Sequence, residues 1–118
     1  LDGNSQDWRY IQVRRTIIYI EQSIRSALQG FAFASNNAGT WSDVAGMIDT
    51  FLTNLWQQGG LQGTSSREAF SVSVGLGSTM TAEDILTGIM RVSVALAVVH
   101  PAEFILIDFE QAMQASGG

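Results

Sequence analysis

The spacing of apolar residues changes partway along this chain, and the change limits which folds the chain can adopt. Between Trp8 and Gln58, apolar residues recur every three or four positions, which is the period of amphipathic helices. From Phe70 to Leu76 they alternate with Ser and Gly, which is the period of a half-buried strand. The pattern predicts an α+β fold of two long amphipathic helices packed on a small, mainly antiparallel sheet.

The first helix is predicted from Trp8 to about Gln29, where Gly30 ends it. The second is predicted from a capping box at Thr40 and Asp43 to about Gln58. Their core-facing residues are predicted to be Tyr10, Val13, Ile17, Ile20, Ile24, Ala27 and Leu28, then Trp41, Val44, Ile48, Phe51, Leu52 and Leu55.

Shorter elements follow from local signals. Thr81 and Asp84 predict a second capping box. Pro101 predicts a tight break between the last two strands. The predicted short elements are a strand at Phe31–Phe33, a helical turn at Ser65–Glu68, a helix at Ala82–Thr87, and strands at Ile89–Val99 and Glu103–Phe109.

The last predicted strand is apolar on both faces. Phe104 and Leu106 point one way, and Ile105, Ile107 and Phe109 point the other way. Such a strand expects cover on both sides, and an uncovered strand edge is a template for a strand from another chain. The residues therefore predict a domain that associates with partners through a strand.

A second ridge runs beside the apolar stripe of the first helix and carries Ile11, Arg14, Ile18, Glu21 and Arg25. Two interpretations stay open. The ridge contacts another subunit, or it lies in solvent while the arginine stems cover the edge of the core.

Composition excludes several classes of function. The net charge of −5 argues against nucleic acid as a ligand. The sequence has no Cys for a disulfide or thiolate metal site. Its most apolar stretch, from Val92 to Ile107, is too short and too interrupted by polar residues for membrane insertion. An apolar share of 46% with only 14% charged residues indicates apolar surface that a partner covers.

The search for chemical sites predicts no catalytic, cofactor-binding or metal-binding residue. His100 is the single histidine and lacks converging carboxylates. The Gly75–Thr79 loop could cradle a phosphate in a small enzyme domain, but the sequence has no Lys for a Walker-type loop, and a plain connecting loop is the simpler interpretation. Glu83 and Asp84 are adjacent on one helix, which does not form an acid–base pair across a pocket.

Several ordered motifs lie between about Asp7 and Gln114. They are Arg9–Glu21 (RYIQVRRTIIYIE), Asn36-Asn37 followed by Thr40-Trp41, Phe51–Trp56 with Gly59–Gly63, Glu68–Phe70 and Pro101–Ile105. Together they resemble the C-terminal domain of phage tail sheath proteins and the sheaths of bacterial contractile injection systems. Gly60 stands where that family usually has Ala.

The resemblance implies a structural subunit whose copies stack as hexameric rings around an inner tube and contract to drive the tube through a target envelope. It implies that the whole chain, 1–118, is one domain of a longer sheath protein, that 111–118 begins a C-terminal arm, and that strands of neighbouring subunits complete the sheet. Expected partners are other copies, the inner tube, baseplate and terminator proteins. Assembly is expected in the cytoplasm of the producing cell.

The resemblance also assigns roles to residues. Glu83 and Asp84 are expected to contact the inner tube. The ridge of Arg14, Ile18, Glu21 and Arg25 is a candidate subunit contact on its residue pattern alone. The strand expected to pair between subunits consists of Phe104, Ile105, Leu106, Ile107, Asp108 and Phe109. A module that adds a strand to an unrelated partner stays open as the alternative.

Overall fold

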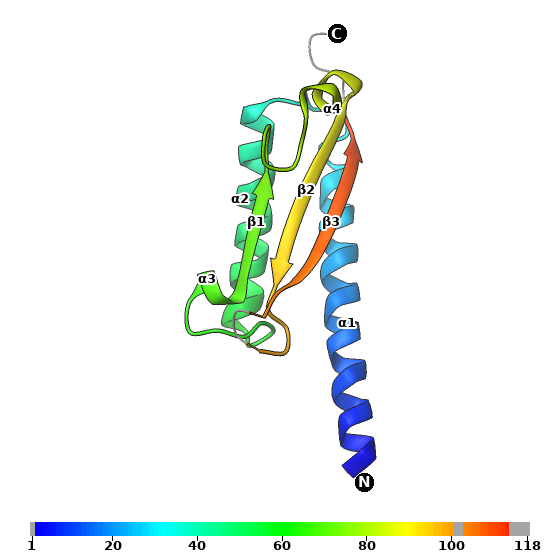
Figure 1. The fold of residues 1–118 in the computed structure, drawn as a ribbon, viewed down its shortest axis with the longest axis vertical. Coiled ribbons are helices and arrows are strands. Elements are labelled where there is room, and N and C mark those ends of the chain that lie inside the picture. Colours follow the sequence, from blue (N-terminus) through cyan, green and yellow to red (C-terminus); the bar gives the residue numbers. More distant parts are fainter. Residues whose placement is uncertain (1, 101–102, 114–118) are drawn as a thin grey trace.

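Two long helices cover one face of a three-stranded antiparallel sheet in the computed structural model, which describes residues 2–100 and 103–113 and the side chains from residue 11 onward (Figure 1). The strand order is β1-β2-β3. The predicted α+β class is confirmed. The elements are α1 (Asp2–Gln29), α2 (Ala38–Gln57), α3 (Ser66–Ala69), β1 (Phe70–Val74), α4 (Ala82–Thr87), β2 (Ile89–Leu96) and β3 (Ile105–Ala112).

The molecule is elongated because α1 continues past the end of the sheet. Figure 1 shows α2 behind β1 and α1 beside and behind β3, with the N-terminal part of α1 projecting beyond the strands. The extents are 59 × 24 × 21 Å and the radius of gyration is 16.0 Å. A compact domain of this length has a radius of gyration of about 13 Å. Because both long helices lie on the same side of the strands, the sheet has one helix-covered face and one open face.

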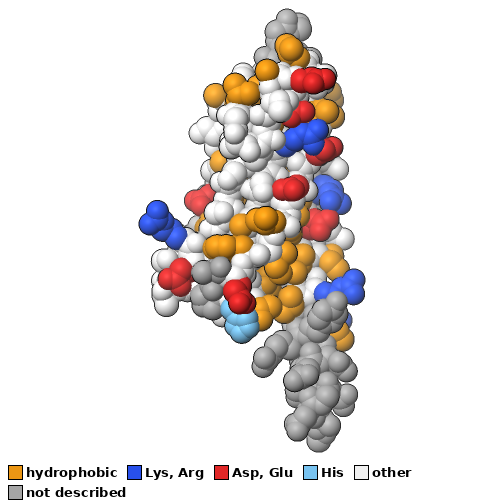
Figure 2. Space-filling model, viewed as in Figure 1, with side chains coloured by type: hydrophobic (Ala, Val, Ile, Leu, Met, Phe, Trp, Pro, Cys, Tyr) orange, Lys and Arg blue, Asp and Glu red, His pale blue; other side chains and the backbone are white. Residues whose placement is uncertain are grey.

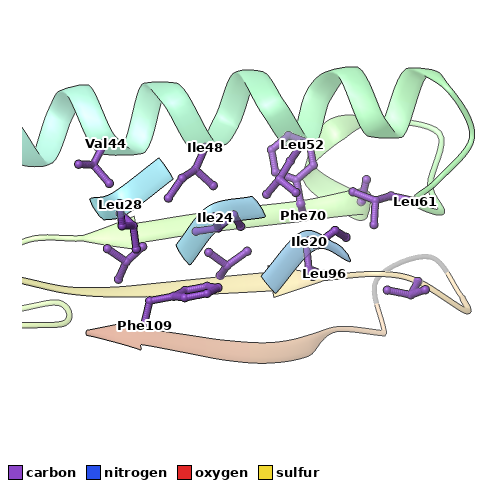
Figure 3. Packing of buried hydrophobic residues seen from close by; sticks show 14 of the residues in the cluster. Ile20, Ile24, Leu28, Val44, Ile48, Leu52, Leu61, Phe70, Leu96 and Phe109 are labelled. Atoms are coloured by element: carbon purple, nitrogen blue, oxygen red, sulfur yellow. The ribbon is translucent and has the colours of Figure 1, made fainter. Parts of the chain in front are cut away.

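The core lies between the helices and the covered face of the sheet, as Figure 3 shows. The predicted stripes of both helices supply its centre, and the even-numbered residues of β2 face them. Burying one such aliphatic side chain contributes about 1.5–3 kcal/mol. The fully buried residues include Ile20, Ile24, Leu28, Ile48, Leu52, Met90, Val92, Val94 and Leu96.

One polar side chain, Asn36, lies inside this core and is completely buried. Its amide nitrogen donates to the carbonyl oxygen of Ile89 at 3.0 Å, and its Oδ1 accepts from the indole nitrogen of Trp41 at 2.6 Å. Because both polar atoms have partners, burial is tolerated. Asn36 thus ties the α1–α2 connection to the first residue of β2.

The structure corrects two predictions in the α1–α2 connection. Asn37, and not Thr40, caps α2, because its Oδ1 accepts from the backbone nitrogen of Thr40 at 3.1 Å. The predicted strand at Phe31–Phe33 is wrong. Those residues form turns, with the nitrogen of Phe31 bonded to the oxygen of Leu28, and they have no strand to pair with.

Strand boundaries also differ from the prediction. β2 ends at Leu96 and not at Val99, because the backbone nitrogen and oxygen of Ala97 bond to Ala69 and Gln62 outside the ladder. β3 begins later than predicted and runs to Ala112, where it pairs with Ile89. The capping box at Thr81 and Asp84 is confirmed in both directions. The predicted break at Pro101 lies outside the described residues.

Candidate functional site

β3 is an edge strand over its whole length. It pairs with β2 through eight residues on one side, from Ile105 to Ala112, and no described strand pairs with its other side. Every second residue of an edge strand turns its N–H and C=O groups away from the sheet. β3 therefore offers backbone donors and acceptors to an incoming strand.

The two halves of β3 differ in how well they are covered. Phe109 is only 3% exposed and belongs to the core, and Ile107 is half-buried beside it. Ile105 is 36% exposed and Leu106 is 71% exposed. The same chain therefore covers the C-terminal half of β3 and leaves apolar side chains open on both faces of the N-terminal half.

The ridge predicted on α1 lies on the side of the helix away from α2. Ser23 and Ala27 face α2 across a small apolar groove. In an α-helix successive residues turn by 100°, so Arg14, Ile18 and Arg25 fall on the opposite side. That side adjoins the free edge of β3, since α1 packs against β3 and α2 packs against β1.

The ridge is exposed and partly ion-paired. Ile18 is 45% exposed, and Arg25 pairs with Glu21 at 2.7 Å one turn away. The structure thus brings together two predicted contacts, the ridge and the last strand. A strand added to β3 would lie beside α1, with its backbone on β3 and its inward side chains near Ile18.

The two residues of the other predicted contact, Glu83 and Asp84 on α4, have different surroundings in the structure. Glu83 is exposed. The Asp84 carboxylate accepts a hydrogen bond from the backbone nitrogen of Thr81 and forms an ion pair with Arg91, whose Nε lies 3.2 Å away. The backbone hydrogen bond from Thr81, followed by the Arg91 guanidinium, lowers the pKa of Asp84. Asp84 is therefore engaged within its own chain.

Arg91, within the strand predicted at Ile89–Val99, links three elements. Its guanidinium pairs with Asp84 on α4 and with Glu110 on β3. Both partners raise the pKa of Arg91, with Asp84 contributing most. The pairing depends on the register between β2 and β3, so the sequence alone carries no signal for it.

The Gly75–Thr79 loop does not present a phosphate cradle. The backbone nitrogens of Ser78, Thr79 and Met80 all donate to the carbonyl oxygen of Gly75, at 3.2, 3.0 and 3.1 Å. The nitrogen of Gly75 donates to Thr79 Oγ1 at 3.2 Å. Because a phosphate needs outward, unoccupied N–H groups, this loop is a closed turn.

An open depression of about 380 Å³ lies on the uncovered face of the sheet. Among the described residues, no group of three or more His, Asp or Glu side chains is placed to hold a metal ion. None of the described helices combines the length and apolarity of a bilayer span. The depression is lined by Ser78, Thr79, Arg91, Ser93, Asp108 and Glu110.

Comparison with known families matches residues 4–112 to a family described as the phage tail sheath C-terminal domain. Among curated protein sequences, none matches this chain. The match covers all the described helices and strands except the first two residues of α1.

Solved assemblies contain similar chains. A chain of the six-fold symmetrised anti-feeding prophage (AFP) baseplate is 45% identical, with a TM-score of 0.71 over 85% of this chain. A chain of the PVC sheath complex of an extracellular contractile injection system, in the contracted state, is 46% identical, with a TM-score of 0.65 over 76% of this chain. A chain of the AFP baseplate in the contracted state is 41% identical, with a TM-score of 0.73 over 83%. This chain spans only about a quarter of those chains, from 25% to 28% of their length.

Proposed function

Because this chain belongs to the phage tail sheath C-terminal domain family, we propose that it is the assembling domain of a contractile sheath. Copies of the complete sheath protein stack as rings around an inner tube and contract to drive the tube through a target envelope. The role is structural and involves no catalysis. The expected setting is a phage tail or a tail-like injection particle, put together in the cytoplasm of the producing cell.

The observation that carries this proposal is the free edge of β3 beside the exposed ridge of α1. The edge supplies a row of backbone groups, and Ile105 leaves apolar surface beside it on the helix-covered face for a second strand to cover. The added strand is an extended segment of a neighbouring copy. Each copy both accepts and donates a strand, so the connections continue from copy to copy. Gln111 and Ala112 pair with β2 of their own chain, so the donated arm begins after Ala112.

Contraction requires two packings of the same subunits that differ in free energy and stay connected throughout. Strand pairing suits this requirement, because backbone hydrogen bonds hold the joint while the rigid domains rotate about it. The partners are other copies, the inner tube, and baseplate and terminator proteins at the two ends. The contact with the inner tube is made through α4, by the exposed Glu83, while Asp84 holds Thr81 and Arg91 within its own chain.

The test uses the full-length sheath protein that carries this domain. Wild-type protein is expected to form striated tubes in negative-stain electron microscopy. Truncation after Pro101 removes β3 and is expected to abolish the tubes. Truncation after Ala112 keeps β3 and removes only the end of the chain, so it isolates the contribution of the arm. Normal tubes from the truncation after Pro101 would overturn the proposal.

A module that adds its strand to an unrelated partner uses the same edge of β3, but it predicts a one-to-one complex and not a lattice. A small phosphate-binding domain is opposed by the Gly75–Thr79 turn, whose donors already have partners. Sedimentation of the purified full-length protein separates a lattice from a one-to-one complex.

A further inference from the structure

The open face of the sheet has two chemically different halves. Side chains of directly paired strand residues share a face, so Ala95 and Leu106 lie together on the open face, as do Ser93 and Asp108. Leu106 is 71% exposed. Figure 2 shows a group of hydrophobic side chains over the middle and lower part of this face, and several charged side chains, with further hydrophobic ones, toward α4.

The half of this face nearer to α4 carries an unbalanced negative charge. Asp84, Asp108 and Glu110 supply three carboxylates, and Arg91 supplies one guanidinium, which leaves a net charge of −2. Arg91 already pairs with Asp84 and Glu110. Asp108 is exposed and makes no ion pair with a described residue. The face therefore suits a partner that has an apolar part followed by a cationic part.

The outer side of α1 has this composition. Ile18 is 45% exposed, and Arg15 lies about one turn before it and is also exposed. Tyr19 is 55% exposed, but its ring lies against Phe51 of α2, with 6.0 Å between the ring centroids. The helix places Arg15 on the side opposite the core stripe of Ile20 and Ile24. One turn of α1 is therefore apolar toward solvent and the preceding turn is basic.

The spacing along the two surfaces agrees. Arg15 and Ile18 are separated by about 4.5 Å along the helix axis. Asp108 and Leu106 are separated by about 7 Å along β3. The long arginine side chain spans the difference, so Ile18 can cover Leu106 while Arg15 reaches Asp108.

We propose that the solvent side of α1 of one copy docks on the open sheet face of the next copy, with Ile18 on Leu106 and Arg15 on Asp108. The contact covers the open face with a helix, as sheets with apolar residues on both faces generally require. Because the two surfaces lie on opposite sides of the domain, the contact is head-to-tail and repeats from copy to copy. The inference rests on the proposed self-assembly, but it concerns the side chains of the open sheet face and not the backbone groups of the free edge of β3.

A charge exchange in the full-length sheath protein tests the contact. Arg15→Asp and Asp108→Arg, each alone, are expected to reduce the fraction of protein that sediments as tubes by about tenfold, because each places like charges together. Both changes in one chain restore the opposite charges and are expected to restore the tubes. Arg67→Asp on α3 serves as the control, since it also reverses an exposed arginine but lies on neither surface.

The absence of Cys in this domain permits a direct second test. Chains with Ile18→Cys and chains with Leu106→Cys, mixed and assembled, are expected to form a disulfide between two copies under mild oxidation. A pair of Ile18→Cys and Ser71→Cys chains is expected to give less of this product, because Ser71 lies on β1, away from the docking position.

The outcomes separate this inference from the proposed sheath function. Wild-type protein without tubes would count against the proposed function. Wild-type tubes combined with single charge variants that assemble normally, or with a double variant no better than the single ones, would overturn the docking of α1 alone. A disulfide formed within one chain that carries both cysteines, without any between chains, would also overturn it, since the cover would then come from the same copy.

Discussion

The two edge strands of the sheet, β1 and β3, flank the same central strand but differ in how completely their own chain covers them. β1 has five residues, and its apolar side chains all face the helices while Ser71 and Ser73 face outward. β3 has eight residues and exposes Ile105 and Leu106 on opposite faces. In β1, apolar and polar side chains alternate strictly, as in an edge strand that its own chain covers completely. In β3 this alternation is lost, which indicates an edge strand that a second chain covers.

Surrounding contacts support the same distinction. The connection before β1 is fastened by the indole nitrogen of Trp56, which donates to the oxygen of Gly63 at 3.0 Å, and by the backbone bond from Ala97 to Ala69 at 2.8 Å. β3 pairs with β2 along its whole length, but the side chains that tie it to the rest of the domain, Phe109 in the core and Glu110 on Arg91, lie in its C-terminal half. Intermolecular contacts are therefore more readily formed at the N-terminal half of β3.

The largest effect is expected from charges placed at matched positions on the two edges. Val72 and Ile107 are both half-buried on the covered face and both pair with Val94. Val72→Asp and Ile107→Asp are each expected to lower the free energy of unfolding of the isolated domain by about 3 kcal/mol, because each buries an unpaired carboxylate. Denaturant unfolding with purified domain measures the change.

Assembly separates the two variants. Ile107→Asp is expected to suppress tube formation by the full-length protein more strongly than Val72→Asp, since an added strand also covers Ile107. Equal suppression by both variants would show that β1 and β3 are equivalent edges.

The next largest effect concerns Asn36, which holds the end of β2 that pairs only with β3. Asn36→Ala leaves the buried oxygen of Ile89 and the indole nitrogen of Trp41 without partners, and we expect a loss of about 2 kcal/mol. Hydrogen exchange is expected to rise at Ile89–Arg91 and at Glu110–Ala112, which pair with each other. Exchange that rises equally in β1 would mean that Asn36 stabilises the sheet as a whole.

Much of the fold, including the difference between β1 and β3, could be predicted from the sequence. Helical stripes and strand alternation depend on residues within a few positions of each other in the sequence. The bounds of α1, α2, α4 and β1 were therefore predicted to within a few residues. The exceptions are the N-terminus of α1 and the cap of α2. The cap was misplaced because both Asn37 and Thr40 have suitable side chains, and the choice depends on which backbone nitrogen each side chain meets.

The arrangement of the candidate site could be predicted only in part. The apolar character of Ile105 and Leu106 is visible in the sequence, and so is the ridge of α1. Their approach at one edge of the sheet depends on which helix covers which strand, and that is decided by packing. The Arg91 links to Asp84 and Glu110 depend in the same way on strand register.

A smaller effect tests how tightly the region before β1 is packed. A Cβ at Gly60 would lie 2.7 Å from Leu55 Cδ1 and 3.1 Å from the Leu55 carbonyl oxygen, so Gly60→Ala is expected to destabilise the domain by about 1 kcal/mol. Gly46→Ala in α2 is the matched control. Its Cβ would meet no atom within 4 Å, so it is expected to stabilise the helix by about 0.5–1 kcal/mol. Thermal melting compares the two, and equal shifts would contradict tight packing before β1.

The smallest effect is the pH dependence of the charged link at the end of β3. The folded-state pKa of Asp84 lies below its ordinary value of 3.8, so its ionised form stabilises the fold above that pH. This contribution is lost as the pH falls through the lowered pKa, whereas Arg91 stays charged throughout. Asp84→Asn is therefore expected to be less stable than wild type near neutral pH, and the difference is expected to shrink below about pH 4. Glu83→Gln removes the same charge from a neighbouring side chain that has no ion pair with the described residues. The melting temperatures of both variants and of wild type are compared between pH 7 and pH 3. A difference between Asp84→Asn and wild type that stays constant over this range would show that Asp84 contributes through its helix cap and not through its charge.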